Sequence, residues 1–195
     1  MIRSFALAAL IGSAAALPAR AEMARYDLDP DHVVVAILVN HMGYENVLGT
    51  FADVSGHYMF DPETHELGAV EVRVGSASVE TRQDDRDGHV KSGDFLNVGE
   101  FPEIMFTADG GTATSDTEGT VDGTVTILGV SKPLTLLVTL NQIAVYPFGH
   151  QKEVVGISAR ATLKRSEFGM TYGVANGLVG DDVNLIIEAE AIRAD

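Results

Sequence analysis

Apolar and polar residues alternate with a period of two through most of this chain, which is typical of β-strands buried on one face. Between Val70 and Val74, three valines share one side and two charged residues the other. The stretch Val33–Val39 is apolar on both faces, so we expect this strand to be covered more deeply than the rest. The same reading predicts further strands at 51–60, 104–108, 119–128, 133–140, 156–164 and 183–193.

Helical patterns are sparse. A short turn is expected at 41–51, directly after the first strand, and a second helical segment at Asp84–Phe95. The latter begins with acidic residues and carries Lys91 near its end, as the helix dipole favours. Its glycines, Gly88 and Gly93, weaken it, so we expect one or two short helices only. About eight antiparallel strands without a βαβ rhythm predict an all-β sandwich or barrel.

The interior of such a barrel has two possible fillings. About eight strands enclose a space that is either packed with side chains or holds one small ligand. The last two strands place alanines on their apolar faces, and small inward residues leave volume. They are Ala159, Ala161, Ala189 and Ala191. The pattern leaves both fillings open.

The first 21 residues have the pattern of a secretory signal peptide, with a basic start, a short apolar run and small residues at Ala19 and Ala21. The run is too short for a membrane span, which needs about 20 apolar residues. We therefore expect an exported periplasmic protein with one domain at 22–195. The chain has no cysteine, which excludes disulfides, thiolate metal sites and a cysteine nucleophile.

The charge is strongly acidic, with 13 basic and 28 acidic side chains. Removal of Arg3 and Arg20 with the signal peptide leaves 11 against 28, a net charge of −17. This excess argues against binding to nucleic acid and against adsorption to anionic lipid surfaces.

Residues with catalytic or metal-binding chemistry do not form a known motif. No nucleophile elbow, phosphate loop or dinucleotide fingerprint occurs, and the six histidines lack metal-ligand spacing, so we expect no enzyme, cofactor or metal site. Asp87, His89 and Ser92 have the residue types of a hydrolytic triad, but three residues within six positions rarely converge. We interpret them as a polar frame that fixes a short helix to the barrel rim.

Several separated motifs, in order, resemble the YceI family of bacterial exported proteins, also described as polyisoprenoid-binding. They include YDLDPDH at 26–32, RDGHVKSGDFLNV at 86–98, LKRSEFGM at 163–170 and VGDDVNLIIEAEA at 179–191. The resemblance implies an extended lipocalin-like antiparallel β-barrel with one or two short helices, whose interior holds a long isoprenoid or other amphiphilic chain. It implies a periplasmic binding or carrier protein rather than an enzyme.

The resemblance also suggests residues at the ligand site. His41 stands at the family's histidine after the first long strand, and the family's central and late motifs supply seven more positions. The apolar run at 95–106 adds two aromatic candidates. The full set is His41, Arg86, Asp87, His89, Ser92, Phe95, Phe101, Phe106, Arg165 and Phe168. Val90 replaces the family's usual leucine, and Leu96-Asn97 replaces its usual Phe-Asp, which predicts a pocket of altered shape.

The ligand's head group is expected to be neutral, such as a quinone or an amide. Between Arg82 and Asp94 there are three basic side chains against four acidic ones, which is no site for a pyrophosphate. A membrane electron-transfer or lipid-handling partner and a homodimer are compatible with this reading. The alternatives are a stress-related or interaction protein with a filled barrel, and a periplasmic enzyme that uses His89 or His41.

Overall fold

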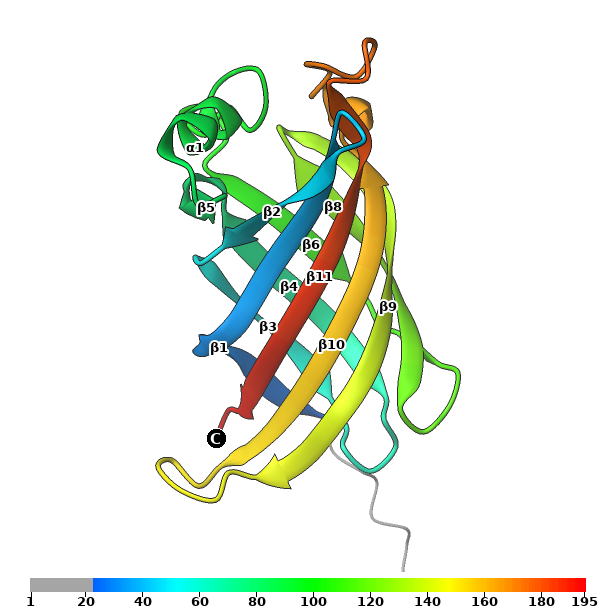
Figure 1. The fold of residues 1–195 in the computed structure, drawn as a ribbon. Helices are drawn as coiled ribbons and strands as arrows, with labels where there is room; N and C mark the ends of the chain where they lie inside the picture. The colour runs from blue at the N-terminus through cyan, green and yellow to red at the C-terminus, as the bar shows by residue number, and fades with distance from the viewer. Residues whose placement is uncertain (1–22) are drawn as a thin grey trace, which may run out of the picture.

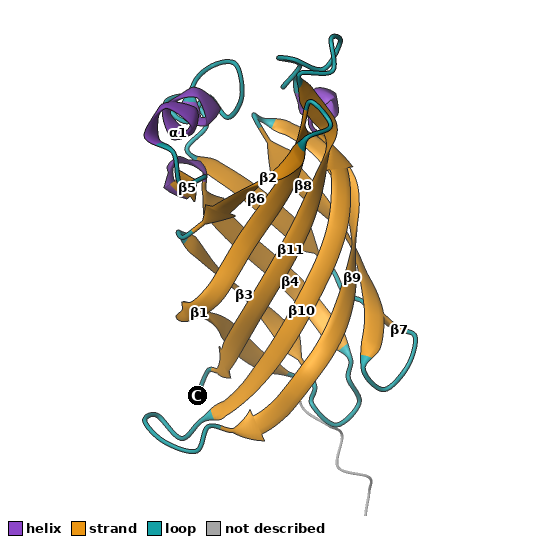
Figure 2. Ribbon diagram, viewed as in Figure 1, coloured by secondary structure: helices purple, strands orange, loops and turns teal. Residues whose placement is uncertain are grey.

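The alternating segments fold into one antiparallel sheet that closes on itself, in a computed structural model that describes residues 23–195 (Figures 1 and 2). The predicted signal peptide, 1–21, lies outside the described residues. Among the described residues a single α-helix, α1, spans Asp84–Lys91, and short 3-10 helices span Ser76–Ser78 and Arg165–Phe168. The strands are β1 (Ala24–His41), β2 (Glu45–Phe51), β3 (Val54–Phe60), β4 (Leu67–Gly75), β5 (Val79–Glu80), β6 (Glu103–Ala108), β7 (Thr112–Ala113), β8 (Glu118–Ile127), β9 (Val130–Val145), β10 (Glu153–Lys164) and β11 (Val179–Arg193).

Closure comes from β1, which pairs with β11 on one side and with β3 and β2 on the other. The ring of eight strands runs β1, β11, β10, β9, β8, β6, β4, β3 and back to β1. All of these neighbours are antiparallel. The barrel prediction is therefore confirmed over the sandwich.

A bulge divides β1 into two parts. Leu28 lies opposite Ala191 and Val33 opposite Ala189, so residues 29–32 of β1 face only Glu190 of β11. Pro30 stands within this bulge, where the missing backbone N–H costs no ladder hydrogen bond. The bulge lets the first part of β1 pair with β3 and the second part with β2.

Two predicted elements differ in the structure. The segment 41–51 is a hairpin and not a helical turn: Met42 and Gly43 have φ values of 53° and 78°, and β2 follows. Two central residues with positive φ form the tight turn whose twist matches antiparallel strands. The expected deep cover of Val33–Val39 is also wrong. Val34 points outward and is 36% exposed, because α1 lies at the end of the barrel and not along its side (Figure 1).

The predicted helix at 84–95 is confirmed in shortened form. The side chain of Gln83 caps α1 by accepting a hydrogen bond from the Arg86 backbone N–H. At the other end, the Ser92 hydroxyl donates to the His89 carbonyl at 2.7 Å, and the helix stops. None of the helices within residues 23–195 is long and apolar enough to cross a membrane.

Candidate ligand-binding cavity

The inward side chains of the barrel do not fill it. They enclose a cavity of about 600 Å³, in the middle of the range of about 300–1,000 Å³ typical of small-molecule sites. Its wall is built by the predicted alternation, in which every second residue of a strand points inward. Typical lining residues are Val33, Val35, Ile37, Val39, Val70, Val72, Val74, Leu134, Leu136, Val138, Leu140, Val183, Leu185 and Ile187. The alternative of a barrel filled with side chains does not fit this interior.

An aromatic cluster joins the first residues of β1 to the last residues of β3, and these strand ends lie at the lower end of the barrel in Figure 1, away from α1. Tyr26 is fully buried, stacks on Tyr58 with ring centroids 5.9 Å apart, and meets Phe60 edge-on. The Tyr26 hydroxyl donates to Glu153, which also accepts a hydrogen bond from Arg193 at 3.1 Å. Burial and the bond to Glu153 raise the pKa of Tyr26. This cluster anchors the apolar end of the cavity to β10 and β11.

The upper end carries polar side chains in the lining. Asn40 and His41 come from the end of β1, Arg86 and His89 from α1, and Arg165 from the start of the second 3-10 helix. In Figure 1, α1, the β1–β2 turn and the segment between β10 and β11 gather at this end. The cavity thus has an apolar body and a polar rim. A second polar border is formed by the β7–β8 hairpin, where Thr112, Ser115 and Thr117 also line the cavity.

Arg86 and Asp87 hold the helix against the barrel through one residue, Thr81. The Arg86 guanidinium donates to the Thr81 hydroxyl at 2.8 Å and to the Thr81 carbonyl at 2.7 Å. The Asp87 carboxylate accepts from the Thr81 hydroxyl and from its backbone N–H. These hydrogen bonds hold the pKa of the Asp87 carboxyl below its usual range.

Aromatic rings cluster beside this helix. His89 meets Phe95 and Tyr172 edge-on, with ring centroids 5.0 and 4.8 Å away, and the Arg165 guanidinium lies 5.4 Å from the centre of the Phe95 ring. The other side of the His89 ring contacts the Asp94 carboxylate at 2.8 Å. Aromatic edges and a stacked guanidinium offer an amphiphile a surface between the apolar interior and water.

Arg165 is the most buried charged residue of the rim, with 2% of its surface exposed. Its guanidinium donates to the carbonyls of Gly180, Met170, Tyr172 and Val179 at 2.7–2.8 Å. Burial lowers its pKa. The side chain therefore fixes the glycine-rich segment 169–178 over the barrel end.

The predicted site residues fall into two groups. The cavity lining includes His41, Arg86, His89, Phe95, Phe106 and Arg165, with Phe106 on β6 within the barrel wall. Outside the lining lie Asp87, Ser92, Phe101 and Phe168. Phe168 is 2% exposed in the main core cluster, and the Ser92 hydroxyl ends α1. Contact of any of these ten residues with a ligand stays a prediction.

The hydrolytic triad considered from the sequence does not form. Asp87 bonds to Thr81, the His89 ring to Asp94, and the Ser92 hydroxyl to a backbone carbonyl. Tyr172 was not among the predicted site residues, although it lines the cavity and completes the aromatic cluster. The glycine-rich stretch around it reads only as a connection.

The fold and this interior define a class of protein: a closed eight-stranded antiparallel barrel with an apolar cavity and a polar rim. The family model described as the YceI-like domain matches residues 26–191, and the chain belongs to the YceI family. A UPF0312 protein of Pseudomonas paraeruginosa is 32% identical over 195 residues, covering 99% of this chain and 100% of the relative. Protein YceI of Salmonella arizonae is 33% identical over 194 residues, covering 97% and 95%.

Two solved structures show the same architecture. The Campylobacter jejuni YceI protein is 34% identical, with a TM-score of 0.72, and the match covers 80% of this chain and 90% of that one. A polyisoprenoid-binding domain from Saccharophagus degradans is 14% identical, with a TM-score of 0.60 and coverage of 89% and 100%. At that identity the second likeness concerns the fold alone.

Proposed function

We propose that this protein is a periplasmic carrier that holds a long-chain isoprenoid or a related amphiphile inside its barrel. The observation that carries the proposal is the apolar cavity of about 600 Å³ with its polar end. A neighbour of the same fold is described as a polyisoprenoid-binding domain, which supports the ligand class. The predicted signal peptide supports the periplasmic location.

Burial of the ligand's apolar chain supplies the binding free energy. Drug-sized ligands gain about 0.3 kcal/mol of binding free energy per heavy atom. At that value a chain of about 40 carbons gains about 12 kcal/mol, near nanomolar affinity. A strong contact to the head group is therefore not needed. The length and width of the cavity select the chain.

The rim favours a neutral head group over a pyrophosphate. The Arg165 guanidinium donates its hydrogen bonds to four backbone carbonyls, and the Arg86 guanidinium donates to Thr81. His89 is paired with Asp94. Because the cationic side chains that line the upper end already have protein partners, a doubly charged head would find little compensation for its lost hydration.

Native mass spectrometry of freshly purified protein, followed by solvent extraction, tests the proposal. We expect one apolar molecule per chain, with a neutral head such as a quinone or an amide. A dominant prenyl pyrophosphate would refute the neutral head group but would agree with the proposed carrier function. Protein that purifies empty and binds no prenyl alcohol or quinone in titrations would refute the carrier itself.

A further inference from the structure

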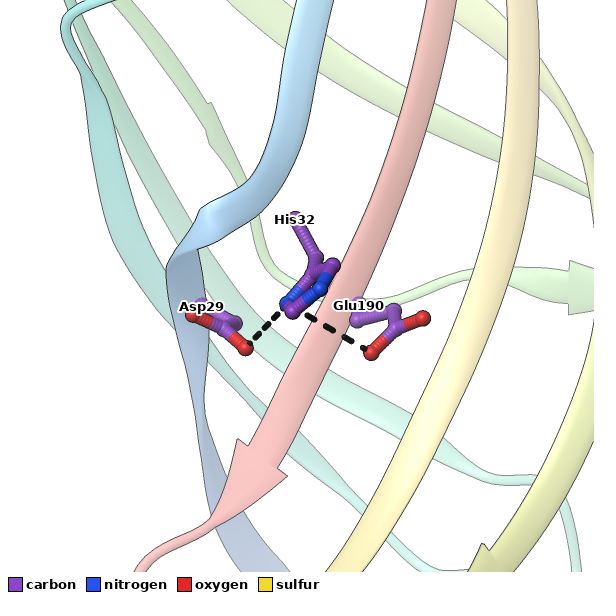
Figure 3. A group of neighbouring side chains, drawn as sticks. All are labelled: Asp29, His32 and Glu190. Atoms are coloured by element: carbon purple, nitrogen blue, oxygen red, sulfur yellow. Dashed lines mark hydrogen bonds and ion pairs between the residues drawn. The ribbon is translucent and has the colours of Figure 1, made fainter. Parts of the chain in front are cut away.

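The bulge in β1 assembles three metal-ligating side chains on the outer wall of the barrel, away from the cavity rim. Asp29 and His32 stand at its two ends, and Glu190 is the one β11 residue opposite it. Figure 3 shows the His32 ring between the two carboxylates. The His32 Nδ1 atom lies 2.8 Å from an Asp29 oxygen and 3.9 Å from the Glu190 Oε2 atom. One ligand atom from each residue lies within 4.8 Å of the others.

The charges at this point are not balanced by the residues that the structure describes. Three carboxylates, those of Asp29, Asp31 and Glu190, act on the His32 imidazole, and the His150 imidazole also acts on Asp29. The Glu190 Oε2 atom is buried and has no hydrogen-bond partner within residues 23–195. A buried carboxylate oxygen without a partner is costly, and a bound cation removes that cost. The His32 side chain is 49% exposed, so an ion has access to the site from solvent.

We infer that Asp29, His32 and Glu190 bind one divalent transition-metal ion of the zinc type. An imidazole nitrogen with two carboxylates suits zinc, whereas calcium and magnesium prefer oxygen ligands alone. Tetrahedral bonds of about 2.0–2.1 Å place neighbouring ligand atoms about 3.3 Å apart. The two contacts of the His32 nitrogen lie on either side of that value, and the Asp29 and Glu190 oxygens lie within 4.8 Å of each other, so movements of these three side chains toward one centre complete the site. Water takes the fourth position.

This site was not predictable from histidine spacing. His32 and Glu190 lie at opposite ends of the chain, and only the β1–β11 pairing that closes the barrel brings them together. Asp29 and His32 are three residues apart in β1, and in a regular strand such residues point to opposite faces of the sheet. The bulge brings both to the outer face. A metal ion there would tie the bulge of β1 to β11 and stabilise barrel closure.

Calorimetric titration of the untagged, chelator-stripped protein with zinc chloride tests the inference. We expect one ion per chain and a raised melting temperature, because an ion that binds only the folded state stabilises it. Glu190→Gln keeps the side chain's size and removes its charge, and should weaken zinc binding by about 10-fold or more, since even outer-shell partners of a metal are worth that much. The matched controls His57→Gln and Glu63→Gln change residues outside this group of three ligands and should bind as the wild type does.

His32→Gln provides a second test, because glutamine retains a donor toward Asp29 but is a poor zinc ligand. Thermal unfolding without metal shows whether each variant is folded. Absence of stoichiometric zinc binding to the wild type would overturn the inference, as would unchanged binding by both site variants or equal weakening in the two controls. The outcome is independent of the cavity's ligand.

Discussion

At the scale of single residues, Arg86 is in the cavity lining and is also a structural anchor. Its two hydrogen bonds to Thr81 involve a charged donor, and such bonds contribute about 1.5–3 kcal/mol. We expect Arg86→Ala to lower the free energy of unfolding by about that amount, measured by urea titration. Arg73→Ala is the matched control: Arg73 forms an ion pair with Glu71 on the solvent side of β4, and such exposed pairs contribute little to stability.

The Arg86→Ala variant also distinguishes a role of Arg86 in holding α1 from a role in binding the ligand. Ligand affinity measured on the folded fraction of Arg86→Ala should change far less than stability does. Unchanged unfolding together with a collapse in affinity would contradict the anchoring role and make Arg86 a direct ligand contact.

The contribution of Asp87 to the stability of the protein depends on pH. Its pKa is lowered by the Thr81 hydrogen bonds, so the folded state holds its proton more weakly than the unfolded state does. The stabilisation is present above the unfolded value of about 3.9 and is lost as the pH falls through the lower folded value. We expect Asp87→Asn to be less stable than the wild type at neutral pH, and the difference to shrink in acid. Urea unfolding at a series of pH values measures this, and a difference that grows in acid would contradict it.

At the scale of elements, the segment 169–178 depends on one side chain. The Arg165 guanidinium, which is nearly completely buried, donates to two carbonyls of this segment, Met170 and Tyr172, and to two at the start of β11, Val179 and Gly180. Lysine keeps the charge but not the planar fork of donors. We expect Arg165→Lys to cost about 3 kcal/mol or more, since several buried carbonyls lose their donor. Hydrogen exchange should rise specifically in 169–178.

The control for that prediction is Arg160→Lys. Arg160 lies on the outer face of β10 in an exposed pair with Glu188, where the cost should stay below about 1 kcal/mol. Equal exchange across 169–178 in both variants would show that other contacts hold the segment.

The strands were predictable because their burial is periodic, and the loops were not because theirs is irregular. Val70, Val72 and Val74 point inward as their spacing indicated, and Val183, Leu185, Ile187 and Ala189 do likewise. The hairpin after β1 escaped prediction because Met42, which is not a usual turn residue, adopts a positive φ there. Tyr172 and Arg165 meet Phe95 only through tertiary packing. Spacing along the chain carries no signal for such contacts.

At the scale of the whole molecule, the proposed ligand binding depends on an interior that the side chains of the barrel do not fill. The inward alanines matter here, because a larger residue at the same position would occupy the space that a ligand needs. Ala159 lies on the cavity wall between Val138 and Ile187, and 2% of its surface is exposed. Ala69 on β4 is exposed and does not line the cavity. The two positions form a matched inside and outside pair for the same substitution.

We expect Ala159→Leu to fold normally but to bind prenyl alcohols more weakly, with the largest loss for the longest chains. Three added carbons displace about three ligand methylenes at up to about 0.8 kcal/mol each, a loss of about 2 kcal/mol or roughly 30-fold in affinity. Ala69→Leu should bind as the wild type does. Competition titrations with prenyl alcohols of increasing length measure both variants. If Ala159→Leu and Ala69→Leu bound equally well, the chain would lie outside the barrel, because a ligand that shares the interior with this side chain has to lose contacts when the side chain grows.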